Sequence, residues 1–225
     1  MTLERGITIE RDLRGGLRRV LRDGGVVTWR NLMNIRRNPE MLMAATVQPI
    51  MFVLLFAFVF GGSLGGGAYR EFLMAGIFTQ TVAFNSAFTT IGMANDLQKG
   101  IIDRFRSLPM SRVAVILGRT CSDLLINALG LLVMAACGLA VGWRVHTGLW
   151  QAVGGFALLL LFAFAMSWTG AFVGLAARSV EVAQSAGFIW MFPVTFCSSA
   201  FVSATNLPGP LRAFAEWNPI TTVAD

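Results

Sequence analysis

Five long runs without a charged residue constrain the fold of this chain more than any other feature. They are residues 41–69, 72–95, 124–143, 145–177 and 182–211. A bilayer core about 30 Å thick needs about 20 helical residues at a rise of about 1.5 Å each, and each run is at least that long. Five such runs in 225 residues leave too few polar positions for the water-facing sides of a soluble helical bundle. The sequence therefore predicts an all-α, multi-pass membrane protein.

The runs also predict how the chain is divided. The five transmembrane helices are expected at about residues 41–62, 72–95, 119–143, 150–177 and 183–205. The segments around them are a basic arm at 1–40, a cytoplasmic loop at 96–118 and an extracellular segment at 206–225. Charged residues make up only 13% of the chain, against roughly a quarter in a soluble domain. This deficit disfavours an ordinary soluble enzyme.

The basic residues predict the orientation in the membrane. If the N-terminus is inside, 15 of the 18 Lys and Arg residues fall on the inner side and 3 on the outer side. Basic residues accumulate on the cytoplasmic side of membrane proteins. We therefore expect a cytoplasmic N-terminus in a protein of the cell membrane.

The basic arm has the pattern of an amphipathic interface helix. Within residues 10–24, apolar and arginine side chains occupy different sides of a helix, which suits a segment lying on an anionic inner leaflet. Gly15 and Gly16 predict a break in this helix, and Asn38–Pro39 predicts a turn after residues 26–37. A plain set of positive-inside anchors without a further role is the open alternative.

The segment 95–125 carries the most information about function. It contains charged Asp96, Lys99, Asp103, Arg104 and Arg106, apolar Ile101, Ile102, Phe105 and Leu108, and then Pro109. The pattern predicts a short helix with its apolar side on the membrane and its charged side toward the cytoplasm. Such a helix is a docking element. Beyond it, Arg119 and Asp123 are spaced i, i+4 and are expected to neutralise each other at the inner end of the third span.

Two stretches of the sequence resemble the ABC-2-type transporter permeases, especially the daunorubicin-resistance-like drug exporters. The cytoplasmic loop of that family resembles GIIDRFRSLPMSRVAVILGR, residues 100–119. The family's extracellular segment before its last helix resembles LPGPLRAFAEWNPIT, residues 207–221. The family has six transmembrane helices, and the sixth is expected just after residue 225. Either the sequence is a fragment, or the last helix comes from elsewhere.

The resemblance implies a permease subunit of an ATP-driven exporter that moves an amphiphilic drug or lipid out of the cell. It implies a dimer of permease subunits, expected to be a homodimer, with separate cytoplasmic ABC ATPase subunits that use ATP and Mg. By this resemblance, the ATPase-coupling loop would consist of Lys99, Asp103, Arg104, Phe105, Arg106 and Arg112.

The sequence lacks the patterns of an enzyme. Its single lysine, Lys99, is not preceded by the GxxxxG of a phosphate loop. His146 has no Cys, Asp or Glu neighbour, and the three cysteines have no metal-binding spacing. We expect no catalytic residues, no metal site and no cofactor bound by this chain.

Polar residues within the spans suggest a route for cargo. Thr81, Asn85 and Thr89 recur at four-residue spacing in the second run. The candidate substrate path consists of Thr81, Asn85, Phe88, Thr89, Trp190 and Phe196. Hydrogen bonding between helices is the alternative role for the polar members. The pairs Gly138/Gly142 and Gly170/Gly174 predict close helix packing.

Two other classes of function stay open. An ion- or proton-coupled secondary transporter would normally use ionisable residues deep in its spans, and the deep parts of the five predicted spans contain none. A non-transport membrane scaffold would need no ATPase partner. The abundance of Phe and Trp, 18 and 6 residues against one Tyr, favours a lipophilic cargo over a polysaccharide.

Overall fold

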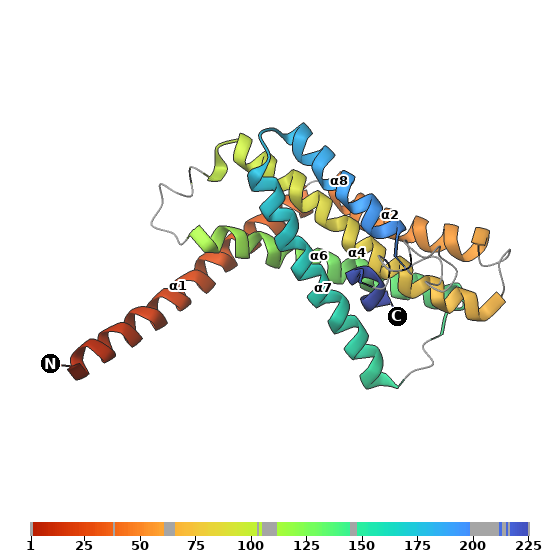
Figure 1. Cartoon of the computed structure of the whole chain (residues 1–225), viewed down its shortest axis with the longest axis horizontal. Helices are drawn as coiled ribbons and strands as arrows, with labels where there is room; N and C mark the ends of the chain where they lie inside the picture. Colours follow the sequence, from red (N-terminus) through yellow and green to blue (C-terminus); the bar gives the residue numbers. More distant parts are fainter. Residues whose placement is uncertain are drawn as a thin grey trace.

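The computed structural model describes residues 2–37, 39–60, 66–102, 104, 112–144, 148–198, 212, 215 and 217–224. In this part of the chain every regular element is helical. The order is α1 (Thr2–Arg37), α2 (Pro39–Leu55), the π-helical η1 (Phe56–Phe60), α4 (Gly66–Gln98), α6 (Arg112–Ala140), α7 (Leu149–Ala176), α8 (Val180–Phe196) and α10 (Pro219–Ala224). The predicted all-α class is confirmed (Figure 1).

Two of the described helices are long and apolar enough to cross a membrane. They comprise Val113–Ala140 in α6 and Leu149–Ala176 in α7. Large apolar side chains also point outward from the bundle, such as Leu132, 67% exposed, and Phe172, 74% exposed. An outer surface of this kind is suited to hydrocarbon rather than water. The count of five spans stays a prediction.

Helix α4 is the central element of the bundle, because α6, α7 and α8 all pack on it. Its closest neighbour is α7 at Gly170 and Gly174. A Cβ atom at either glycine would collide with a backbone carbonyl oxygen of α4, that of Ser86 or of Thr90. The predicted close packing at this glycine pair is confirmed, and it brings the two backbones together without intervening side chains.

The second predicted glycine pair has a different role. Gly138 is buried and lies against the end of the Met74 side chain. Gly142 lies beyond the end of α6 with a φ of 98°. The Trp143 N–H donates to the Gly138 carbonyl and the Gly142 N–H donates to the Leu139 carbonyl. This is a Schellman cap, so the prediction of a packing pair is wrong at Gly142, which ends the helix instead.

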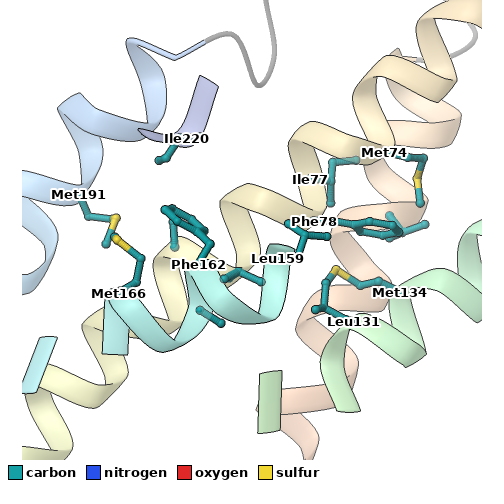
Figure 2. Packing of buried hydrophobic residues seen from close by; sticks show 14 residues of the cluster. Met74, Ile77, Phe78, Leu131, Met134, Leu159, Phe162, Met166, Met191 and Ile220 are labelled. Atoms are coloured by element: carbon teal, nitrogen blue, oxygen red, sulfur yellow. The ribbon is translucent and has the colours of Figure 1, made fainter. Parts of the chain in front are cut away.

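Apolar side chains from six elements, including Val53 of α2, form the core between the helices (Figure 2). The labelled members are Met74, Ile77 and Phe78 of α4, Leu131 and Met134 of α6, Leu159, Phe162 and Met166 of α7, Met191 of α8 and Ile220 of α10. Ile220 is fully buried and lies near Phe162. Part of the predicted extracellular segment therefore returns to the bundle as α10.

Asn218 joins the end of α8 to the beginning of α10. Its Nδ2 donates to the carbonyl oxygens of Val194, at 2.5 Å, and Cys197, at 3.4 Å. Its Oδ1 accepts from the Ile220 N–H at 3.0 Å. Helix ends leave backbone groups without intrahelical partners, and one side chain here satisfies groups at both ends. Pro219 follows at the first helical position, where its missing N–H costs nothing.

Helix α8 begins with a capped turn outside its predicted span. The Ser179 hydroxyl accepts a hydrogen bond from the Val182 N–H at 3.3 Å. The pKa of Glu181 lies below its ordinary value, mainly because its carboxylate hydrogen-bonds to the Ser179 side chain and, to a smaller extent, because it hydrogen-bonds to its own backbone. An ionised carboxylate in the first turn favours the helix, because the N-terminus of a helix carries partial positive charge.

Helix α1 is continuous from Thr2 to Arg37, so the predicted break at Gly15 and Gly16 is wrong. Each glycine costs a helix about 1 kcal/mol, and once a helix exists each added residue gains a hydrogen bond. Figure 1 shows the N-terminal part of α1 extending away from the other helices. Asn38 lies outside the described residues, and α2 begins at Pro39.

The C-terminal half of α1 packs on α6. The Thr28 hydroxyl donates to the Gly118 carbonyl at 3.1 Å, and a Cβ at Gly118 would lie 2.5 Å from the Cβ of Val27. Part of the predicted surface arm is therefore a component of the helix bundle. Leu21, Val26 and Trp29 are more than 60% exposed on α1, which fits a helix that also contacts the bilayer interface.

The packing of α4 on α7 predicts unequal effects of alanine along α7. Gly170→Ala or Gly174→Ala should destabilise the protein by about 1–3 kcal/mol, because the added methyl group meets the α4 backbone. Gly154→Ala is the matched control, since a Cβ there has no atom within 4 Å. Thermal unfolding in detergent should show a lower Tm for the first two variants and an equal or higher Tm for the control. Three equal Tm values would contradict the described contact.

Candidate functional site

A buried carboxylate joins three helices near the centre of the bundle. Asp123 of α6 is 8% exposed. Its Oδ2 accepts hydrogen bonds from the hydroxyls of Thr89 on α4, at 2.8 Å, and Ser167 on α7, at 2.9 Å. Asp123 is the twelfth residue of α6, about 16 Å along the helix axis from the first at about 1.5 Å per residue.

The predicted pair of Arg119 and Asp123 is confirmed. Arg119 Nε lies 3.4 Å from Asp123 Oδ1, although the Nε–H is not aligned for a hydrogen bond. The guanidinium also lies across Gly92 of α4, where a Cβ would collide with it. Arg119 Nη1 is 4.0 Å from Asp96 Oδ2, so this guanidinium sits between two carboxylates.

Helix α1 joins the same group of polar side chains. Arg30 Nη2 lies 3.5 Å from Asp96 Oδ2 and donates to Asn31 Oδ1 at 2.8 Å. Asn31 Nδ2 donates to Ser122 Oγ on α6 at 3.2 Å. Two arginines from different helices therefore share the Asp96 carboxylate.

The group continues along α6 and α4 away from Asp96. Asn127 Nδ2 donates to the Asp123 carbonyl at 2.9 Å, and its Oδ1 accepts from Asn85 Nδ2 at 2.7 Å. We call the whole set the polar network. Its members are Arg30, Asn31, Asn85, Thr89, Asp96, Arg119, Ser122, Asp123, Asn127 and Ser167.

A cavity of about 210 Å³ lies on another side of α4, between α2 and α8. We call it the aromatic groove. It is lined by Gln48, Phe52, Gln80, Thr81, Phe84, Phe88 and Phe188. Phe84 packs edge-on against Phe192 at 5.6 Å between centroids, and lies tilted to Phe188 at 6.4 Å. The lining contains no charged side chain.

The structure divides the predicted substrate path between these two features. Thr81 and Phe88 line the aromatic groove. Asn85 and Thr89 instead belong to the polar network, where they hydrogen-bond to α6. Each helical residue is rotated by about 100° from the one before it, so residues spaced four apart are offset by about 40° per step. Successive members of such a stripe therefore come to face different neighbouring helices.

The two members from α8 lie outside the lining of the groove. Trp190 packs against the apolar core. Phe196 is 60% exposed and stacks on Phe192 with 5.7 Å between ring centroids. Neither residue lines the cavity, and a transport role for either stays a prediction.

The predicted coupling loop is described in part. Lys99 and Arg104 are exposed. Gly100 has a φ of 66°, and its carbonyl accepts from the Arg104 N–H at 3.0 Å. Asp103, Phe105 and Arg106 lie outside the described residues, as does the side chain of Arg112, the first residue of α6.

Ile102 anchors this turn to the bundle. It is 8% exposed and packs with Met93 of α4 and Ala171 of α7. The sequence predicts an apolar side that faces the membrane, whereas the described apolar residue Ile102 contacts other helices. A force on the turn would therefore be transmitted first to α4 and α7.

Sequence reasoning missed several members of both features. Gln80, Phe84 and Phe188 line the groove, and Ser167 and Asn127 belong to the polar network. Gln80 and Asn127 could have been noticed as amide side chains inside apolar runs, which are costly in lipid. Phe84 and Phe188 had no such signal among 18 Phe residues.

The described residues contain no cluster of three or more His, Cys, Asp or Glu side chains that could hold a metal ion. The absence of a bound cofactor stays a prediction. The site consists of a charged network and a largely apolar groove on different sides of one helix. A largely apolar cavity of this kind can bind an apolar ligand.

Residues 24–225 match the ABC-2 type transporter family. The chain belongs to this family. The resemblance identified in the two sequence stretches is therefore confirmed, and the chain is a membrane-integral, multi-pass ABC-2 permease.

Relatives with drug-resistance names support this assignment. The chain is 30% identical over 198 residues to a daunorubicin resistance ABC transporter permease protein from Streptomyces coeruleorubidus, a match that covers 87% of this chain and 70% of that protein. It is 26% identical over 143 residues to a doxorubicin resistance ABC transporter permease protein from Mycobacterium tuberculosis strain CDC 1551 / Oshkosh. The second match covers 59% of this chain and 50% of the relative, so it spans half the length of the mycobacterial protein.

The polar network predicts a non-additive response to substitution of its central ion pair. Asp123→Leu should cost about 3 kcal/mol of stability, because it leaves Arg119 without its nearest partner and two hydroxyls without their acceptor. The double variant Arg119→Leu/Asp123→Leu should be more stable than the single variant Asp123→Leu, since it leaves no uncompensated charge at the pair. Denaturant unfolding of the two single variants and the double variant measures the coupling. Additive losses would show that the two side chains act independently.

Proposed function

We propose that this chain is the transmembrane subunit of an ATP-driven exporter that moves an amphiphilic drug or lipid out of the cell. The observation that carries the proposal is the family match over residues 24–225, together with 30% identity to a daunorubicin resistance permease. The aromatic groove supports a lipophilic cargo, because four Phe side chains line it and no charged side chain does.

The proposed partner is a separate cytoplasmic ABC ATPase that binds and hydrolyses ATP with Mg. The coupling loop, formed by Lys99, Asp103, Arg104, Phe105, Arg106 and Arg112, would receive its motion. The exposed Lys99 and Arg104 suit contact with a partner. Ile102, buried between α4, α6 and α7, would pass the motion to the membrane helices.

The polar network supports a path from this loop toward the groove. It extends from Asp96, three residues before Lys99, to Asn85. Asn85 directly follows Phe84, which lines the groove. A rotation or shift of α4 driven at the cytoplasmic end would therefore move the groove wall as well.

The proposed assembly is a homodimer of permease subunits in the cell membrane, with cytoplasmic N-termini. The charge distribution, 15 basic residues inside and 3 outside, supports the orientation. The apolar outward surfaces of α6 and α7 would face lipid or the second subunit.

A proton-coupled transporter is the second candidate, because Asp123 is an acid within the bundle, where the sequence alone had suggested no deep ionisable group. Its contacts weaken this candidate. The carboxylate is paired with Arg119 and accepts two hydroxyl hydrogen bonds from α4 and α7, so it holds three helices together. Breaking these buried contacts in each transport cycle would be costly.

Transport should depend on the partner ATPase. When the full-length protein is co-expressed with the ATPase encoded beside its gene, cells should accumulate less doxorubicin than cells without the pair. Replacing the phosphate-loop lysine of that ATPase should abolish the difference. If efflux persists in that variant, or follows a pH gradient in ATP-depleted cells, the exporter proposal is wrong.

Assembly with the ATPase should depend on the charges of the coupling loop. Reversal of charge at Asp103, Arg104 and Arg106 should remove the ATPase from pull-downs of the permease, because docking of this kind relies on complementary charge. Arg144→Glu is the matched control, since Arg144 is exposed and is predicted on the outer side. Equal recovery of the ATPase with all proteins would refute the docking role.

A further inference from the structure

The carboxamide of Gln80 is one of three polar groups, with Gln48 and Thr81, among the Phe side chains that line the aromatic groove. Gln80 is 7% exposed, and it lines the cavity together with Phe84 and Phe88 of the same helix. Its Oε1 is buried, and no described residue donates a hydrogen bond to it. A buried carbonyl oxygen without a donor is costly to maintain in a protein interior.

The surroundings of Gln80 make this cost harder to avoid. Every backbone or side-chain polar group at membrane depth needs a partner within the protein or its ligand, because hydrocarbon supplies none. A lipid chain in the groove would leave Oε1 without a donor. A ligand with a hydroxyl or N–H group would supply one.

The aromatic side chains define the rest of the ligand. Phe84 contacts Phe188 in a tilted geometry and Phe192 edge-on. Phe52, Phe88 and Phe188 complete the walls. Rings arranged in this way favour a flat aromatic guest in stacked or edge-to-face contact. The cavity of about 210 Å³ is large enough for a fused two-ring system.

We propose that the aromatic groove is a cargo-binding site in which Gln80 is the specificity-determining residue. It selects, among flat aromatic molecules, those that can donate a hydrogen bond to Oε1. This inference rests on the proposed export function for its biological meaning, and it names the residue that recognises the cargo. Thr81 is half-buried beside it and is a neighbour in the same wall.

The test uses two probes of the same ring system, in one of which a methyl group replaces the donating hydroxyl hydrogen. Binding of 2-naphthol and 2-methoxynaphthalene to the full-length protein in nanodiscs is measured by equilibrium dialysis, and the uptake by empty nanodiscs is subtracted. The wild-type protein should bind 2-naphthol about tenfold more tightly, the effect expected from one added hydrogen bond in a buried site.

Three variants locate the effect. Gln80→Leu should reduce the preference to about onefold by weakening 2-naphthol while 2-methoxynaphthalene binds as before. Gln80→Asn withdraws the acceptor by one methylene and should lower the preference partly, which keeps the test valid if the leucine variant fails to fold. Gln98→Leu, at the exposed end of α4 outside the groove, should retain the full preference.

The proposal is overturned if the wild-type protein binds both probes equally, if neither probe saturates above the empty nanodiscs, or if Gln80→Leu keeps the preference. These outcomes are distinct from failure of the export proposal. If the wild-type protein shows ATP-dependent efflux but no preference for 2-naphthol over 2-methoxynaphthalene, only the role of Gln80 is rejected. A preserved preference in a protein whose efflux ignores the ATPase would reject the export mechanism and leave the binding site in place.

Discussion

The arrangement of the helices depends on the hydrogen bonds and the ion pair of the buried Asp123 carboxylate. The carboxylate accepts hydroxyl hydrogen bonds from α4 and α7 and pairs with Arg119 on its own helix. A charge in this position is tolerated only when it is paired and hydrogen-bonded. The close approach of α4 and α7 at Gly170 and Gly174 brings the two hydroxyls within reach of one oxygen. Backbone packing and buried charge therefore support each other.

Because α4 is fixed between α6 and α7, its different faces make different contacts. The side with Asn85 and Thr89 is tied to α6, and the side with Ser86 and Thr90 is pressed against α7. The side with Gln80 and its aromatic neighbours borders the groove. Because a helix is rigid along its axis, a displacement at the C-terminal end of α4 would be felt at the groove. In the proposed exporter, α4 would link the ATPase to the cargo.

Much of the fold follows from the sequence, because charge is costly in a bilayer. Helix α7 begins and ends within one residue of the predicted span 150–177, whereas α6 begins seven residues before its predicted span and α1 lies outside every charge-free run. The i, i+4 spacing of Arg119 and Asp123 and the small residues at Gly170 and Gly174 also predict contacts correctly, since each depends on one helix face.

The remaining contacts depend on which helices pack against one another, and the residue pattern within a single helix does not predict its neighbours. Thr81, Asn85 and Thr89 form one stripe in the sequence, yet α6 lies against the last two and leaves the first at the groove. The continuity of α1 past Gly15 and Gly16 likewise depends on helix cooperativity more than on local propensity. The importance of Gln80 emerges only once its unpartnered oxygen is located among aromatic rings.

The central claim, that α4 holds the polar network on one side and the groove on another, is tested most directly by cross-linking. Cys121, Cys137 and Cys197 are first replaced by Ala, and cysteine pairs are then placed at Asn85→Cys/Asn127→Cys or at Phe84→Cys/Asn127→Cys. A short bifunctional thiol reagent should link the first pair in membranes, because the two native side chains are hydrogen-bonded at 2.7 Å, and should leave the second pair unlinked. Efficient linkage of the Phe84 pair, with little linkage of the Asn85 pair, would contradict the account.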